Sequence, residues 1–227
     1  IYIPKDVEKL VNLKTLKLPK ISNLDSIVHI DLIPNLEVLH ISDIDYNDLN
    51  ELLNRLKLSS LKQLFIYNII NSKRKLPHSI FKLKKIEKLH ITSMNTTKLN
   101  CKISKLENLR SIHLNSKLKR IPNAVLKLTN LEELALPNSD LKKIKPNIAK
   151  LSNLKHFAFS GKQIKKFPNA ILKLKKLERL GIINTSIQKL PNNIDELENL
   201  KKIGSPFREF YHYYKDRIKE KLPNCTL

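Results

Sequence analysis

The chain has 227 residues, with 43 Lys and Arg against 21 Asp and Glu, and its formal net charge of +22 favours nucleic acid, an anionic membrane or an acidic protein surface as a partner. The joint abundance of Lys, Asn and Ile also agrees with a simpler cause, the codon bias of an AT-rich genome. No apolar stretch approaches the roughly 18 to 20 residues of a membrane-spanning helix, and two cysteines, Cys101 and Cys225, are too few for a disulfide-rich extracellular domain.

One order of apolar residues recurs along almost the whole chain. The segment L-x-x-L-x-L begins at nine markers spaced 22 to 25 residues apart: Leu13, Leu36, Leu61, Ile86, Leu109, Leu131, Leu154, Leu177 and Leu200. This period resembles that of the leucine-rich repeat family, whose repeats have about 20 to 29 residues. Because one such repeat cannot bury its own apolar face, the pattern predicts a single stacked array.

The chain enters this pattern partway through a repeat. Pro4, Val7 and Leu10 already fit the pattern, so the first repeat is incomplete. A solenoid needs polar caps to stay soluble. We therefore expect residues upstream of Ile1 to cover the apolar edge of the first repeat.

The repeats that begin at Leu36 and Leu61 are each two residues longer than the common length of 23. In the first of them, leucines at i, i+3, i+4 and i+7 predict an α-helix; these are Leu49, Leu52, Leu53 and Leu56. In the second, the polar insertion 71–75 predicts a loop.

From Ile86 onward the repeats are more regular. Apolar pairs such as Leu134 and Leu136 alternate with the period of two that a strand requires. The following P-x-x-I-x-x-L segments, such as 168–174, have apolar residues three apart, which predicts a short 3₁₀ or α turn opening near proline. Each repeat is therefore predicted to be a strand, a loop and a helical turn.

The repeat pattern ends at Gly204. Beyond it, apolar and aromatic residues recur at helical spacing: Phe207, Phe210, Tyr211, Tyr214, Ile218 and Leu222. We expect an amphipathic helix that packs over the last repeat, with a tyrosine-rich docking surface as the alternative. The predicted organisation is a repeat solenoid over 1–204, of about nine repeats, and a capping helix and tail over 205–227.

The segment 184–194, NTSIQKLPNNI, resembles the cytoplasmic repeats of plant disease-resistance receptors, Ras-suppressor-like proteins and bacterial host-directed leucine-rich repeat proteins. The resemblance implies an α/β solenoid, a horseshoe with a parallel sheet on its concave face and short helices or 3₁₀ turns on its convex face. It also implies a cytoplasmic protein, or one delivered into a host cytoplasm. Its expected function is non-enzymatic protein recognition, as part of an immune receptor, a signalling scaffold or an effector.

The chain departs from the family at one position. The family places an asparagine nine residues into each repeat, where its side chain bonds neighbouring backbone. None of the corresponding residues is asparagine: they are Ile21, Ile44, Ile69, Met94, Lys117, Ser139, Lys162 and Thr185. We expect only the hydroxyls of Ser139 and Thr185 to replace those bonds.

A candidate binding strip follows from the outward strand positions. The residue between the second and third apolar positions of successive repeats is Lys17, His40, Phe65, His90, His113, Ala135, Ala158, Gly181 and Gly204. Because neighbouring strands lie about 4.8 Å apart, the rings should form one strip. The full candidate partner-binding surface is His40, Phe65, Tyr67, His90, Thr92, His113, Asn115, His156 and Arg179. Rings can anchor an interface, although strands favour flat side chains in any case.

Other chemistries find less support in the sequence. His90 and His113 could share zinc, but a third and a fourth ligand are not evident, so we expect no metal or cofactor. No catalytic motif is present, and we expect no enzyme. The alternative function is salt-dependent binding of nucleic acid or anionic membrane by lysine-rich flanks, namely Lys82, Lys84, Lys85, Lys173, Lys175 and Lys176.

Overall fold

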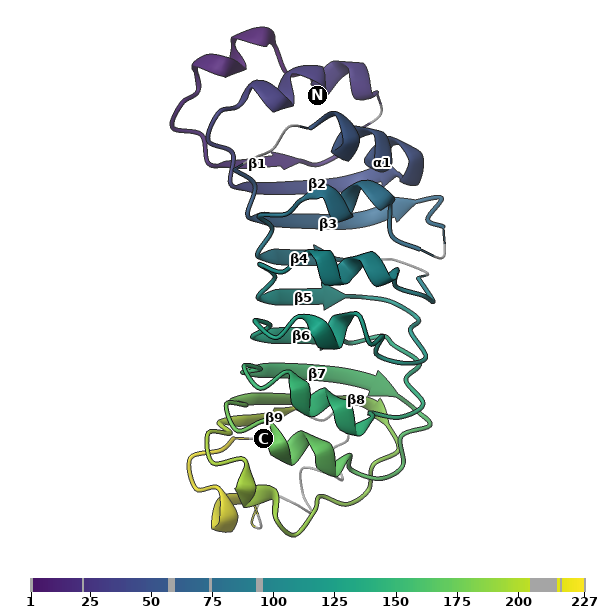
Figure 1. Ribbon diagram of the computed structural model, residues 1–227, viewed down its shortest axis with the longest axis vertical. Helices are drawn as coiled ribbons and strands as arrows, with labels where there is room; N and C mark the ends of the chain where they lie inside the picture. The colour runs from purple at the N-terminus through teal and green to yellow at the C-terminus, as the bar shows by residue number, and fades with distance from the viewer. Residues whose placement is uncertain are drawn as a thin grey trace. The chain divides into compact units, whose positions relative to one another are not determined.

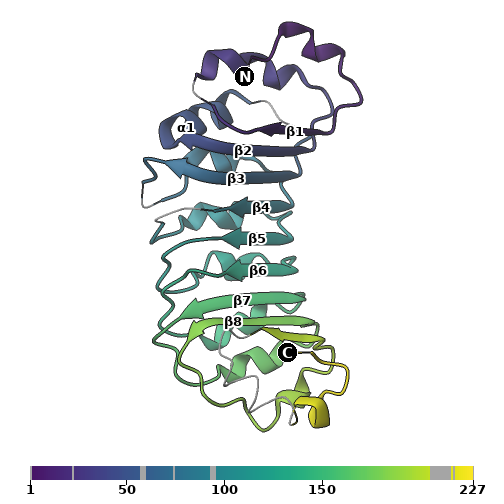
Figure 2. The same cartoon turned by 180° about the vertical axis from the view of Figure 1, so that it is seen from behind.

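The structure is a computed structural model that describes residues 2–21, 23–56, 60–73, 75–92, 96–204, 216 and 218–226. The chain divides into two compact units, Ile1–Leu114 and Asn115–Leu227. In each unit, parallel strands lie side by side in chain order and helical turns cover one surface of the sheet (Figure 1). Figure 2 looks onto the opposite surface of each sheet, which we call the strand face.

The first unit is a stack of repeats. Its strands are β1 (Thr15–Leu18), β2 (Val38–Asp45), β3 (Gln63–Ile70), β4 (Lys88–Ile91) and β5 (Ser111–Leu114). Its helical segments are η1 (Lys5–Lys9), η2 (Leu24–Leu32), α1 (Tyr46–Arg55), η3 (His78–Lys82) and η4 (Cys101–Lys105), where η marks a 3₁₀ helix. Equivalent residues of successive repeats face each other, so that Leu39 pairs with Leu64 and Leu64 with Leu89.

The second unit repeats this arrangement. Its strands are β6 (Glu133–Leu136), β7 (His156–Gly161), β8 (Arg179–Thr185) and β9 (Lys202–Gly204). Its 3₁₀ segments are η5 (Val125–Lys127), η6 (Pro146–Lys150), η7 (Asn169–Lys173) and η8 (Ile194–Glu196). Within the described ranges of both units, no helix has the length and apolar character needed to cross a bilayer.

The core lies between the strands and the helical turns. The two apolar residues of each strand point into it, as the period of two predicts; Phe157 and Phe159 of β7 are among the largest fully buried side chains. The marker residues Leu109, Leu154 and Leu177 are also fully buried. The residue between the two apolar positions of a strand is half-buried or exposed in most strands, as at His40, Phe65 and Ala158, whereas Ala135 of β6 is buried. Most strands therefore have the predicted core side and outward side.

The predicted helix in the longer repeat is confirmed as α1. Leu49, Leu52 and Leu53 are buried along one side of it. The Asp45 carboxylate accepts a hydrogen bond from the Asn47 N–H at 2.7 Å and caps the first turn. The extra residues of this repeat therefore build a full helix in place of a short turn.

The predicted turns of the regular repeats are confirmed as 3₁₀ segments. Pro168 stands at the N-cap of η7, and Pro146 is the first residue of η6. The Leu174 N–H then donates to the Ile171 carbonyl at 2.9 Å, and the Leu177 N–H donates to the Leu174 carbonyl at 2.9 Å. These consecutive i to i−3 bonds lead directly from the turn into the next strand.

An asparagine ladder is present, but at a position that the sequence interpretation missed. Asparagine stands immediately before several marker residues, and its side-chain amide donates to a backbone carbonyl 24 residues earlier. The bonds are Asn35 to Val11, Asn108 to Lys84 and Asn199 to Lys175 at 2.8 Å, and Asn153 to Thr129 at 3.0 Å. Each bond ties the entry of one strand to the preceding repeat.

Alternating charges run beside this ladder. The residue after each marker is in turn basic and acidic: Lys14, Glu37, Lys62, Glu87 and Arg110 in the first unit, and Glu132, Lys155, Glu178 and Lys201 in the second. The Glu37 carboxylate lies 3.1 Å from the Lys62 ammonium group, and the Glu178 carboxylate lies 2.9 Å from the Lys201 ammonium group. Pairs of opposite charge on neighbouring strands support the register of the sheet.

The residues at the position where the family carries asparagine differ in their surroundings. Ile21, Ile44 and Ile69 are buried and extend the apolar core. The Thr185 hydroxyl accepts from the Ile187 N–H at 3.5 Å, as expected for a substitute bond. The same expectation is wrong for Ser139, because its buried hydroxyl has no partner among the described residues, and its carbonyl instead accepts from the Ser160 hydroxyl at 2.7 Å.

The predicted capping helix falls largely on 205–215 and 217, which lie outside the described residues. In the described part of the tail, Ile218, Leu222 and Cys225 are buried. The Thr226 carbonyl accepts from the Ile203 N–H at 2.8 Å, and the Thr226 N–H donates to the Lys201 carbonyl at 2.8 Å. The tail therefore forms an isolated parallel bridge beside β9, which periodicity did not indicate.

Gly161 lies where the backbone of the preceding repeat comes close to β7. A Cβ at this position would lie 2.0 Å from the Leu141 carbonyl oxygen, a backbone atom that cannot rotate away. We expect Gly161→Ala to lower the free energy of unfolding by about 2 kcal/mol, as overpacking commonly does. Urea denaturation followed by circular dichroism measures this change.

Gly204→Ala is the matched control, because nothing lies within 4 Å of the Cβ that it adds. Its effect should stay within about 0.5 kcal/mol. Equal losses of stability in the two variants would show that the close approach at Gly161 is not the cause.

Candidate functional site

A column of rings crosses the strand face of the first unit. The strand register pairs His40 with Phe65, Phe65 with His90, and His90 with His113. Their ring centroids lie 4.3, 5.7 and 4.1 Å apart in that order, and the first and last pairs are stacked. We call these four residues the ring column. All four side chains are half-buried, so the column presents a continuous surface to solvent.

Neighbouring side chains hold the column in place. The Tyr67 ring lies 6.1 Å from His40 and 5.7 Å from His90, and the Tyr67 hydroxyl lies 3.4 Å from His40 Nδ1. The Lys88 ammonium stands 5.6 Å from the centroid of Phe65, a cation–π distance. These contacts reduce the number of rotamers that the rings lose on binding a partner.

The surroundings of His40 shift its ionisation. Its partial burial, and then the positive charge of Lys17, lower the pKa of His40 below its ordinary value of 6.5. Both causes favour the neutral imidazole. This end of the column is therefore uncharged at neutral pH.

The other predicted surface residues fall in both units. Thr92 follows β4, and its N–H donates to the Ile66 carbonyl at 2.9 Å. Asn115 begins the second unit, where it accepts a hydrogen bond from the Asn138 amide at 2.8 Å. His156 and Arg179 are neighbours across β7 and β8. The structure thus groups the predicted residues around two surfaces, and their role in binding stays a prediction.

A shallow groove of about 250 Å³ occupies the strand face of the second unit. Its floor includes the small residues that the sequence places at the outward strand positions: Ala135, Ala158, Gly181 and Gly204. Charged and polar side chains also line it: Glu133, His156, Arg179 and Lys202. The outward strand positions that carry rings in the first unit therefore carry small residues in the second unit, and these small residues leave the groove open.

Most of the predicted basic flank is engaged within the chain. Lys82 donates to Asn54 at 2.7 Å, Lys84 to the Lys105 carbonyl at 3.4 Å, Lys175 to Glu196 at 3.2 Å and Lys176 to Asn153 at 2.7 Å. Lys85 and Lys173 are exposed. The first three lysines lie in one unit and the last three in the other, and their role in binding stays a prediction.

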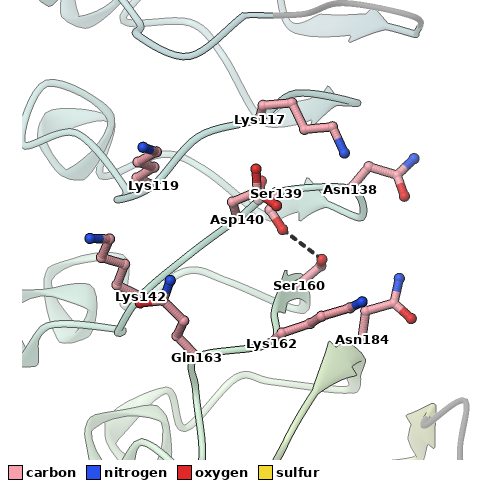
Figure 3. Close-up of a pocket in the computed structure, with 10 residues that line it drawn as sticks. All are labelled: Lys117, Lys119, Asn138, Ser139, Asp140, Lys142, Ser160, Lys162, Gln163 and Asn184. Atoms are coloured by element: carbon pink, nitrogen blue, oxygen red, sulfur yellow. Dashed lines mark hydrogen bonds between the residues drawn. The ribbon is translucent and has the colours of Figure 1, made fainter.

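The sequence interpretation missed a larger pocket in the second unit. The pocket has a volume of about 500 Å³ and is lined by Lys117, Lys119, Asn138, Ser139, Asp140, Lys142, Ser160, Lys162, Gln163 and Asn184 (Figure 3). We call it the lysine pocket. Its sequence signal was the pair Lys117 and Lys162, which stand where the family carries asparagine. In the described residues, no three His, Cys, Asp or Glu side chains gather as metal ligands.

Solved structures of several bacterial proteins resemble the chain. A leucine-rich repeat protein of Leptospira interrogans is 24% identical, with a TM-score of 0.64 over 100% of this chain and 63% of its own. An internalin of Listeria monocytogenes is 15% identical, with a TM-score of 0.68 over 100% of this chain and 63% of its own. The chain thus spans less than two thirds of these two proteins.

The leucine-rich repeat domain of the type III effector XopL is 20% identical, with a TM-score of 0.62 over 98% of this chain and 77% of its own. No protein-family model and no curated protein sequence matches the chain. The strands, 3₁₀ turns and repeat ladders described above agree with these structural neighbours. The chain therefore has the leucine-rich repeat fold.

Proposed function

We propose that the chain is a non-enzymatic recognition module that binds a partner protein across the strand face of the first unit. The ring column carries this proposal. Rings in mutual contact on four neighbouring strands offer large contact areas that are already ordered before binding. Aromatic anchors of this kind supply much of the binding energy in protein interfaces.

The charges around the column indicate the chemistry of the partner. His40 is held neutral, while Lys17 and Lys88 stand beside the rings. A partner that fits this surface carries apolar or aromatic side chains at its centre and acidic side chains at its rim. The rim charges would mainly raise the association rate, whereas the rings would mainly slow dissociation.

The biological setting is part of the same proposal. The resemblance to plant receptor repeats and bacterial host-directed repeats supports a place in an immune receptor, a signalling scaffold or an effector. A cytoplasmic location, or delivery into a host cytoplasm, is supported by the two free cysteines, of which Cys101 is exposed and Cys225 is buried.

Binding of nucleic acid or anionic membrane is the second candidate function, which the net charge of +22 favours. The flank lysines support it weakly, because Lys82, Lys84, Lys175 and Lys176 already contact groups of the chain itself. Affinity for RNA or acidic vesicles that falls steeply with salt concentration would favour this second function over protein recognition.

The variant His90→Glu with His113→Glu tests the ring column. Two carboxylates on neighbouring strands would place charge on the apolar centre of the surface, so we expect partner binding to weaken by about tenfold or more. Quantitative co-precipitation, followed by titration of the captured protein against the purified chain, measures this loss. Circular dichroism should show the same fold in the variant and the wild type.

The matched control is Lys102→Gln with Lys105→Gln, which changes the charge equally at exposed positions of η4 in the same unit. This variant should bind as the wild type does. Unaltered binding of the histidine variant, or equal weakening in both variants, would move the interface away from the ring column.

The shifted pKa of His40 predicts a pH dependence of stability. Because the folded state holds the pKa of His40 below 6.5, the unfolded chain binds more protons as the solution is acidified. This contribution to stability is complete above pH 6.5 and is lost as the pH falls through that value towards the lower folded pKa. The wild type should therefore lose more stability than His40→Gln between about pH 7.5 and about pH 5 in urea denaturation. Equal losses would contradict the assignment.

A further inference from the structure

The lysine pocket lies at the carboxyl ends of strands in the second unit. Asn138 follows β6, Lys162 follows β7, and Asn184 stands near the end of β8. The pocket is thus built from equivalent positions of successive repeats. Its volume of about 500 Å³ falls within the range of small-molecule sites, about 300 to 1,000 Å³.

Charge in the pocket is strongly unbalanced. Four lysines line it against one carboxylate, that of Asp140. Elsewhere in this unit lysines pair with acids, as Lys155 does with Glu132 at 2.8 Å and Lys201 with Glu178 at 2.9 Å. In the described part of the chain, no hydrogen bond or ion pair from the ammonium groups of the four pocket lysines is found. Their mutual repulsion therefore makes an anion the favoured occupant.

The lysines fall into two groups of similar composition. In Figure 3, Lys117 and Lys162 extend to one side of the Ser139–Asp140 segment, the side where Asn138 and Asn184 lie. On the other side lie Lys119, Lys142 and Gln163. Each group combines two ammonium groups with at least one side-chain amide. This pairing suits a ligand with at least two anionic centres, because each group can neutralise one centre.

The floor of the pocket offers one further unsatisfied group. Ser139 is 3% exposed and lines the pocket, and its hydroxyl has no hydrogen-bond partner among the described residues. A buried hydroxyl without a partner is destabilising, and a ligand oxygen or a water can supply the missing hydrogen bond.

The chemistry of the lining selects among anions. Lysine binds phosphate as a point charge, and the side chains that line the pocket include no aromatic ring. Single-stranded nucleic acid is usually held by stacking its bases on aromatic side chains, so phosphate groups alone fit the pocket better. We propose that the lysine pocket binds a small molecule that carries two or more phosphate groups, independently of protein binding at the ring column.

Isothermal titration of the whole chain with inorganic tripolyphosphate tests this proposal. We expect one saturable site per chain, with an affinity that falls as salt is added. In the variant Lys117→Gln with Lys162→Gln, the affinity should fall at least tenfold. The control Lys127→Gln with Lys150→Gln removes the same charge from exposed turns of the same unit, and it should reduce affinity less than twofold.

Asp140→Asn provides a test in the opposite direction. Removing the one carboxylate of the pocket should strengthen tripolyphosphate binding several-fold while leaving the circular dichroism unchanged. A gain of affinity cannot arise from a loss of fold. This variant therefore tests the pocket even if the lysine variant loses binding because it unfolds.

Three outcomes would overturn the proposal. The first is no saturable binding of tripolyphosphate at low salt. The second is equal weakening in the two lysine variants, which would assign binding to diffuse surface charge. The third is tighter binding of a short single-stranded RNA than of tripolyphosphate, with loss of RNA affinity in the pocket variant, which would assign the pocket to nucleic acid. None of these outcomes bears on partner binding at the ring column, which the His90 and His113 variant tests separately.

Discussion

Within each unit, every strand after the first takes backbone hydrogen bonds from the preceding repeat. The Lys62 N–H donates to the Glu37 carbonyl at 2.8 Å, and the Glu87 N–H donates to the Lys62 carbonyl at 2.7 Å. The same relation recurs in the second unit between Glu178 and Lys155 at 2.7 Å. Because no repeat can satisfy these groups alone, stability belongs to neighbouring pairs of repeats. The asparagine ladder and the buried marker residues strengthen the same contacts.

This dependence on neighbours leaves the outward strand positions free to vary. In the first unit those positions carry the stacked rings of the ring column, and in the second they carry small residues that form a groove. The core beneath them is the same in both units, with paired aliphatic or aromatic residues. Surface chemistry can therefore change along the array without a change of fold, which is typical of repeat proteins.

The sequence predicted the features of the fold that follow from a periodic pattern of apolar residues. Alternation at Leu134 and Leu136, and the helical spacing from Leu49 to Leu56, identify a strand and α1 because each pattern reports one local backbone geometry. The adjacency of His90 and His113 follows from strand spacing alone. The lysine pocket could not be found in this way, because it depends on loop conformations in several repeats.

The hydrogen-bond partners of the flank lysines could not be predicted from the sequence either. Lys176 donates to Asn153, and Lys82 to Asn54, across 23 and 28 residues of chain. Long, flexible side chains can reach several partners at such separations, and no local pattern selects one of them. The isolated bridge of Thr226 is a similar case, since its pairing with Lys202 depends on how the chain returns after the last repeat.

The alternating charges beside the marker residues have a consequence for how such an array can grow. Glu37 stands between Lys14 and Lys62, so duplication or loss of a single repeat would place two like charges on neighbouring strands. Duplication or loss of two repeats together would keep the alternation. A gain or loss of repeats in pairs, about 46 residues, would therefore preserve these ion pairs, although the geometry of the fold repeats with every single repeat.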